Sequence, residues 1–94
     1  MDRQSEYDYD YNITHGQSEE RRGDSYDASK QYMTAKGCYF EAMSYYEKAS
    51  RIASRAGDSS ARDYADRLYY GAKGKAHEMG YKYNKAAEED KHTY

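Results

Sequence analysis

The chain has 94 residues and a formal net charge of −2 at pH 7. A chain of this length buries about 60–65% of the surface that its unfolded form exposes, so we expect one core and one domain. The single cysteine, Cys38, excludes an internal disulfide, and there is no apolar run typical of a membrane span or a secretion signal. We therefore expect a cytoplasmic protein with no membrane partner.

The material for that core is unusual. The sequence contains no Val, Trp or Pro, one Leu and one Phe, but 14 Tyr. Tyr and Ala must therefore fill positions that Leu and Val usually fill. Because a buried Tyr hydroxyl needs a hydrogen-bond partner, the rings are expected at the margins of a thin core. Oligomerisation or a bound partner would help to stabilise such a core.

Residues 1–23 show neither a helical nor a strand period and are rich in acids, Ser and Gln. They predict a flexible, acidic, Tyr-bearing arm. Tyr7, Tyr9 and Tyr11 alternate with polar residues, so a short extended segment that docks on a partner is an alternative. Residues 24–94 are expected to form a helical bundle.

Two helices are predicted in the first part of that bundle. The first covers residues 24–37, with Asp24 or Ser25 as its N-cap. The second covers residues 39–56, because Ala and Tyr recur there at three- and four-residue steps. Gly57 is expected to end it.

A third helix is predicted after the capping residues 58–60 and carries the clearest apolar stripe in the chain. Gly71 and Gly74 lie inside it and cost about 1 kcal/mol each relative to Ala. Either another backbone approaches them closely, or the helix breaks between Gly71 and Gly80 and a fourth helix follows. The prediction is an all-α, small antiparallel three- or four-helix bundle with a flexible N-terminal arm.

The segment from Lys36 to Ala49 resembles the second half of a tetratricopeptide repeat, whose signature positions are occupied by Gly37, Tyr39, Ala42, Tyr46 and Ala49. This resemblance implies that Gly37 lies at a turn between two antiparallel helices. The same pattern is similar to the first corner of microtubule-interacting-and-trafficking domains, which are single three-helix bundles. Both resemblances imply a helical fold.

Catalysis and metal binding need His, Cys, Asp or Glu side chains that lie close together, and the sequence offers few candidates for such a cluster. His15, His77, His92 and Cys38 show no metal-ligand spacing. We expect no enzyme activity, no cofactor and no metal.

Aromatic residues are interleaved with basic residues along the second and third predicted helices. Such a pattern either stacks bases and neutralises phosphates, or forms a partly buried Tyr row with a solvated basic edge. The second interpretation is preferred because no basic face is free of Asp or Glu. Tyr and Arg are also enriched at protein-interface hot spots. The predicted partner-binding residues are Tyr7, Tyr9, Tyr11, Tyr45, Arg62, Arg67, Tyr69, Tyr70 and Lys73.

The resulting hypothesis is a non-enzymatic protein-interaction module, an adaptor or inhibitor, that binds another protein through its helix faces and its arm. A small domain with an acidic arm and no catalytic set resembles phage accessory and counter-defence proteins, which bind and block a host enzyme. Two alternatives are a nucleotide or nucleic-acid binder and a self-assembling structural protein that forms a homo-oligomer.

Overall fold

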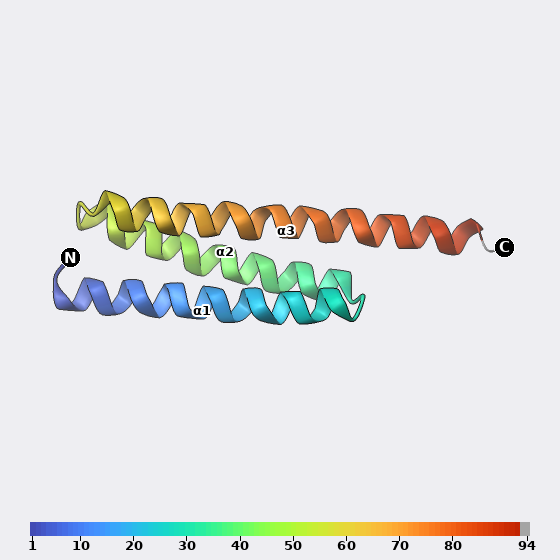
Figure 1. Ribbon diagram of the computed structural model, residues 1–94, viewed down its shortest axis with the longest axis horizontal. Helices are drawn as coiled ribbons and strands as arrows, with labels where there is room; N and C mark the ends of the chain where they lie inside the picture. The colour runs from blue at the N-terminus through green and yellow to red at the C-terminus, as the bar shows by residue number, and fades with distance from the viewer. Residues whose placement is uncertain (93–94) are drawn as a thin grey trace.

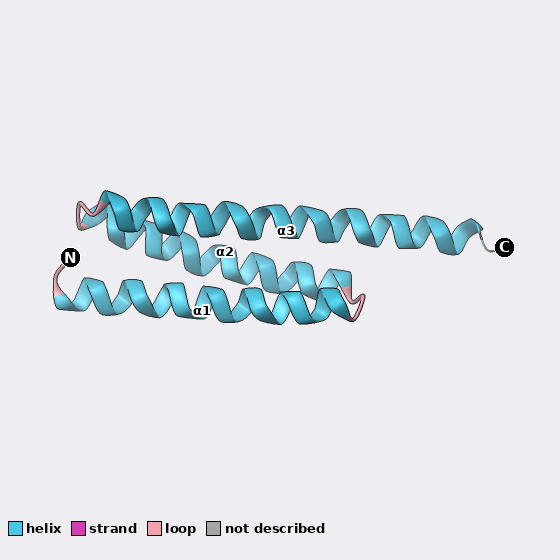
Figure 2. Cartoon of the chain, viewed as in Figure 1, coloured by secondary structure: helices cyan, strands magenta, loops and turns pink. Residues whose placement is uncertain are grey.

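A computed structural model describes residues 1–92 and shows three helices that run antiparallel in chain order (Figure 1). They are α1 (Arg3–Ala28), α2 (Tyr32–Arg55) and α3 (Ser59–His92). Within the described residues there is no strand (Figure 2). The second helix packs along both others, whereas α1 and α3 contact each other little. The predicted small all-α bundle is confirmed, with three helices.

The N-terminal segment differs from the expectation. Residues 3–23 belong to α1, so no flexible arm precedes the bundle and a single helix crosses the expected boundary. The carboxylate of Asp2 caps this helix by accepting a hydrogen bond from the backbone N–H of Ser5 at 2.8 Å. A hydrophobicity pattern does not reveal this helix, because its buried positions are not all apolar. Tyr9 and Ile13 are buried, but so are Asn12, Gly16 and Gly23.

The first turn lies earlier in the chain than the sequence predicts. The first helix ends at Ala28, Lys30 takes a left-handed conformation with φ of 62°, and α2 begins at Tyr32. Gly37, which the family resemblances place at a corner, therefore lies exposed inside α2. The expected helix over residues 24–37 does not exist, because this turn divides it.

The second turn agrees with the sequence. The second helix ends at Arg55, and Gly57 supplies the positive φ of 71° that an L side chain rarely adopts. The carboxylate of Asp58 then accepts a hydrogen bond from the backbone N–H of Ala61 at 3.0 Å and caps α3.

The third helix is continuous through its glycines. Gly71 and Gly74 lie within α3, and a Cβ atom added to either would meet nothing within 4 Å. Neither a helix break nor a close backbone approach accounts for them. Beyond the turn between α1 and α2, the last turns of α3 extend past the other two helices (Figure 1).

Two glycines of α1 receive two tyrosine rings of α2. A Cβ atom on Gly16 would lie 2.7 Å from Cδ1 of Tyr46 and closer still to Cε1, and one on Gly23 would lie 2.6 Å from Cε1 of Tyr39. Gly16 and Gly23 are seven residues apart on α1, and Tyr39 and Tyr46 are seven residues apart on α2. Because seven residues are close to two helical turns, both contacts lie on the same faces of the two helices. The rings of Tyr39 and Tyr46 are consequently almost fully buried.

Small residues bring α2 and α3 together. The buried positions of α2 include four alanines, and α3 presents three, so the two backbones can approach closely. Met79 is the only fully buried large aliphatic side chain among the described residues. The buried alanines are Ala35, Ala42, Ala49, Ala53, Ala65, Ala72 and Ala76.

The hydroxyl groups of the two buried tyrosines end in a charged cluster. Tyr39 Oη donates to Asp24 Oδ1 at 2.6 Å, and Tyr46 Oη donates to Glu20 Oε1 at 2.8 Å. From α3, Lys75 Nζ donates to Glu20 Oε2 at 2.7 Å and to Asp24 Oδ1 at 3.2 Å. The cluster thus satisfies each buried hydroxyl and joins α3 to α1.

This environment shifts several protonation equilibria. Burial first, then the hydrogen-bonded carboxylates, raise the pKa of Tyr39 and Tyr46 well above the ordinary tyrosine value. Burial opposes the charge of Lys75, but the hydrogen bonds to Glu20 and Asp24 outweigh it and raise the pKa of Lys75. All three shifts favour the protonated form in the folded state.

Methyl groups at the two kinds of glycine should have opposite effects. Gly16→Ala and Gly23→Ala force the ring of Tyr46 or Tyr39 to move, and we expect each to lower the free energy of unfolding by about 1–3 kcal/mol. Gly71→Ala and Gly74→Ala add a methyl group in open space and should raise it by about 0.5–1 kcal/mol each. Urea denaturation followed by circular dichroism measures all four. Equal effects at the two kinds of site would contradict the ring-on-glycine packing.

The buried tyrosines should make the protein sensitive to alkali. An unfolded tyrosine loses its proton near pH 10, whereas the folded ones hold it, so stability is full below pH 10 and falls as the pH rises above it. Each tyrosine contributes at most about 1.4 kcal/mol per pH unit to this fall. The double variant Tyr39→Phe/Tyr46→Phe should be less stable at pH 7 but should decline less steeply between about pH 10 and 12. Tyr81→Phe, at an exposed position, is the control. If the free energy of unfolding of the double variant falls as steeply with pH as that of wild type, Tyr39 and Tyr46 are not the source of the alkali sensitivity.

Candidate functional site

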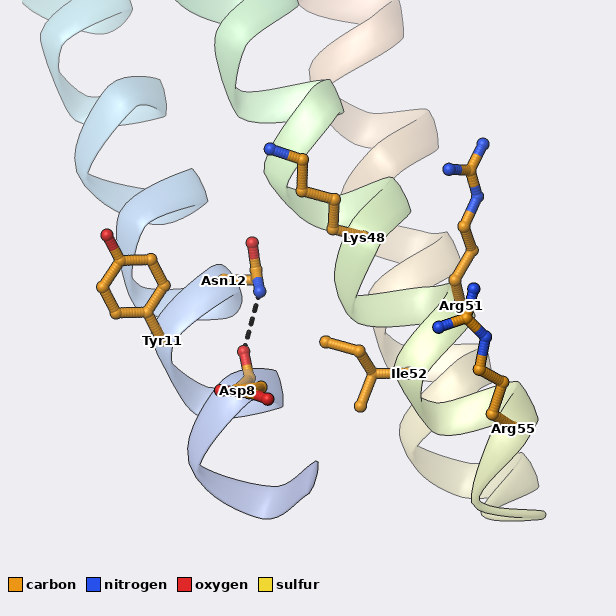
Figure 3. A pocket seen from close by; sticks show the side chains of 7 residues that line it. All are labelled: Asp8, Tyr11, Asn12, Lys48, Arg51, Ile52 and Arg55. Carbon is orange, nitrogen blue, oxygen red and sulfur yellow. Dashed lines mark hydrogen bonds between the residues drawn. The ribbon is translucent and has the colours of Figure 1, made fainter. Parts of the chain in front are cut away.

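A cleft of about 420 Å³ opens between the start of α1 and the end of α2. In Figure 3, Asn12 and Ile52 lie between the two helices, and Tyr11 and the two arginines lie farther out on either side. The residues that line the cleft are Asp8, Tyr11 and Asn12 of α1 and Lys48, Arg51, Ile52 and Arg55 of α2.

The wall formed by α2 is basic. Lys48, Arg51 and Arg55 follow one another at three- and four-residue steps, so they form one stripe on the helix. Arg51 forms a salt bridge with Glu47. Lys48 Nζ lies 5.4 Å from the centroid of the Tyr45 ring. Among residues 1–92, no hydrogen bond or ion pair engages the guanidinium group of Arg55, which is therefore free to bind an external anion.

The wall formed by α1 contains a buried polar residue. Asn12 Nδ2 donates to the backbone oxygen of Asp8 at 2.8 Å, which is a common way for an amide side chain to satisfy its donor within a helix. The Asp8 carboxylate accepts a hydrogen bond from Gln4 Nε2 at 3.0 Å. In Figure 3 the side-chain oxygen of Asn12 points in the opposite direction to the Nδ2 atom that donates this hydrogen bond. This wall offers one acid and one amide opposite the three cations.

Aromatic rings bridge α1 and α2 beside the cleft. The ring centroids of Tyr11 and His15 are 4.1 Å apart, and those of His15 and Tyr45 are 5.5 Å apart. Because Lys48 lies over Tyr45, the column of rings ends at the basic wall. Rings and cations thus share one surface. Such a surface suits carboxylates or phosphates that arrive together with an apolar or planar group.

The predicted partner-binding residues fall into separate groups. Tyr11, which lines the cleft, is joined to Tyr45 through the ring of His15. On α3, the rings of Tyr69 and Tyr70 meet edge to face at 5.2 Å, and Lys73 Nζ lies 5.9 Å from the Tyr70 centroid.

The remaining predicted residues take other positions. Tyr7 is exposed on α1 and shares a shallow hollow with Tyr11. Arg67 is exposed on α3, and Arg62 pairs with Asp63. Tyr9 is buried and its hydroxyl donates to the backbone oxygen of Ala61 at 2.8 Å, so it fixes α1 to the start of α3 instead of facing a partner.

The basic wall lies outside the predicted set. The spacing of Lys48, Arg51 and Arg55 is visible in the sequence and places them on one helix face. Their position beside α1 is not, because the sequence does not show that α1 is a helix. Cys38, the other reactive residue, is buried inside α2, and burial raises the pKa of its thiol.

In the described part of the chain, no three His, Cys, Asp or Glu side chains gather as metal ligands do. None of the described helices combines the length and the apolar character that a membrane crossing requires. Comparisons with protein-family models, with curated proteins and with solved structures found no match for this chain.

Proposed function

We propose that the chain is a non-catalytic protein-interaction module and that it binds its partner at the cleft between α1 and α2. The observation that carries this proposal is a single cleft with the half-exposed ring of Tyr11 on one wall and Lys48 and Arg55 on the other, the guanidinium group of Arg55 having no partner within residues 1–92. Tyr and Arg contribute most often to interface hot spots. All these side chains project from helices, so the backbone is already ordered and binding costs only the rotamer freedom of the side chains.

The lining of the cleft supports a specific chemistry for the proposed partner. A carboxylate would bind between Lys48 and Arg55, and an apolar side chain would cover Ile52 and the edge of Tyr11. Asp8 on the opposite wall would accept a hydrogen bond or pair with a cation of the partner. An adaptor and an inhibitor of the phage type would both use such a surface.

The proposed module could resemble either of two helical families. Three antiparallel helices suit a microtubule-interacting-and-trafficking type of module better than a tetratricopeptide hairpin. The position of Gly37 inside α2 counts against the corner that both families share.

A nucleic-acid binder is the second candidate, favoured by the Tyr11–His15–Tyr45 column beside three cations. Stacking rings and basic side chains are the usual elements of single-strand binding. However, Asp8 lines the same cleft and Glu47 pairs with Arg51, so phosphates would meet two carboxylates. A protein partner therefore fits better.

Capture experiments with paired variants test the proposal. The double variant Tyr11→Ala/Arg55→Glu removes the ring and reverses the free charge of the cleft. Its control is Tyr81→Ala/Lys85→Glu, which makes the same kind of change on exposed residues of α3. Lysate of the source cells is treated or not treated with nuclease, and bound material is identified by mass spectrometry and ultraviolet absorbance. We expect a stoichiometric protein that survives nuclease and whose affinity falls 10- to 100-fold in the cleft variant only.

Two other results would count against the cleft as a protein-binding surface. Loss of all bound material with nuclease, together with an affinity that falls steeply with salt, would favour the nucleic-acid candidate. Equal binding by the cleft variant and its control would exclude the cleft as the binding surface.

A further inference from the structure

A second surface lies between α2 and α3, away from α1. A hollow of about 120 Å³ is lined by Lys36, Phe40 and Met43 of α2 and by Lys73, Ala76 and His77 of α3. No residue of α1 contributes to it. This surface, called the α2–α3 groove below, is thus separate from the cleft between α1 and α2.

The groove contains one large apolar side chain outside the core, Phe40, beside Met43, which packs against the core. The chain has one Phe, and Phe40 is 50% exposed in the groove. Met33, seven residues earlier on the same face of α2, is 52% exposed, while alanines fill the interior. In a chain with so few large apolar residues, a stripe of them in solvent indicates a surface that another molecule covers.

Two lysines, one from each helix, line the hollow with Phe40. Lys36 Nζ lies 5.7 Å from the Phe40 ring centroid, and Lys73 Nζ lies 5.9 Å from that of Tyr70. His77 completes the lining, which contains no carboxylate. Glu41 follows Phe40 in the chain but does not line the hollow.

We propose that the α2–α3 groove binds an acidic amphipathic helix of a partner protein. An apolar side chain of that helix would pack against Phe40 and Met43, and flanking carboxylates would pair with Lys36 and Lys73. The stripe from Met33 to Met43 rises about 15 Å along α2, which is two to three helical turns. Helix-in-groove binding commonly uses apolar anchors at i, i+4 and i+7 over this length.

This proposal goes beyond the function assigned to the cleft, because it gives the chain a second binding face with a defined partner chemistry. Two faces on opposite flanks of α2 would let the chain hold two partners at once. The two proposals fail independently, because each depends on side chains that the other does not use.

Peptide display tests the groove directly. A phage library of random 16-residue peptides is selected on the immobilised wild-type protein, and enriched peptides are synthesised for titration calorimetry. We expect helical peptides with Leu, Ile or Phe at i, i+4 and i+7 and with several Asp or Glu. Their affinity should fall at least tenfold in Phe40→Ser and in Lys36→Glu/Lys73→Glu.

Three controls separate the outcomes. Lys30→Glu/Lys85→Glu makes the same charge change outside the groove and should leave the affinity unchanged, as should Tyr11→Ala/Arg55→Glu. Circular dichroism checks that each variant is folded. The proposal is overturned if no peptide is enriched, if the enriched peptides lack acids, or if Phe40→Ser binds them as wild type does. A dimer seen by light scattering that Phe40→Ser abolishes would instead assign the groove to a second copy of the chain.

Discussion

The fit of two tyrosine rings against two glycines is the contact on which this bundle depends. The rings of Tyr39 and Tyr46 occupy the space that side chains at Gly23 and Gly16 would fill. Without Val and with a single Leu, the chain has few other large groups to bury between α1 and α2. A ring packed on bare backbone removes a large apolar area from water without needing an apolar residue on the facing helix. The phenol oxygens then require the carboxylates of Glu20 and Asp24, and these require Lys75.

This arrangement explains which parts of the fold were predictable. The faces of α2 and α3 follow from Ala and Tyr at three- and four-residue steps, and Gly57 and Asp58 mark the turn between them. The first helix was not predictable, because Asn12, Gly16 and Gly23 count as polar or helix-breaking in a sequence pattern although all three are buried. Their suitability depends on rings supplied by another helix, and a local pattern contains no such information.

The candidate site, too, was only partly predictable from the sequence. Composition led to the prediction that tyrosines bind a partner, and of these Tyr11 lines the cleft while Tyr45 joins it through the ring of His15. Composition was not enough to separate Tyr11 from Tyr9, which differ by two positions on α1 and lie on different faces, one exposed and one buried. The pair of Arg51 with Glu47 follows from their four-residue spacing on a predicted helix, whereas the absence of a partner for Arg55 within residues 1–92 depends on which acids the folded chain brings near.

The three helices are held together by different means. The contact between α2 and α3 includes a row of alanines with Met79, whereas α1 attaches through the two rings on its glycines, through Tyr9 and Ile13, and through ion pairs to Lys75 and Lys82. The cleft exists only while α1 is packed on α2, but no residue of α1 lines the α2–α3 groove. A local opening of α1 would therefore dismantle the cleft and leave the groove intact.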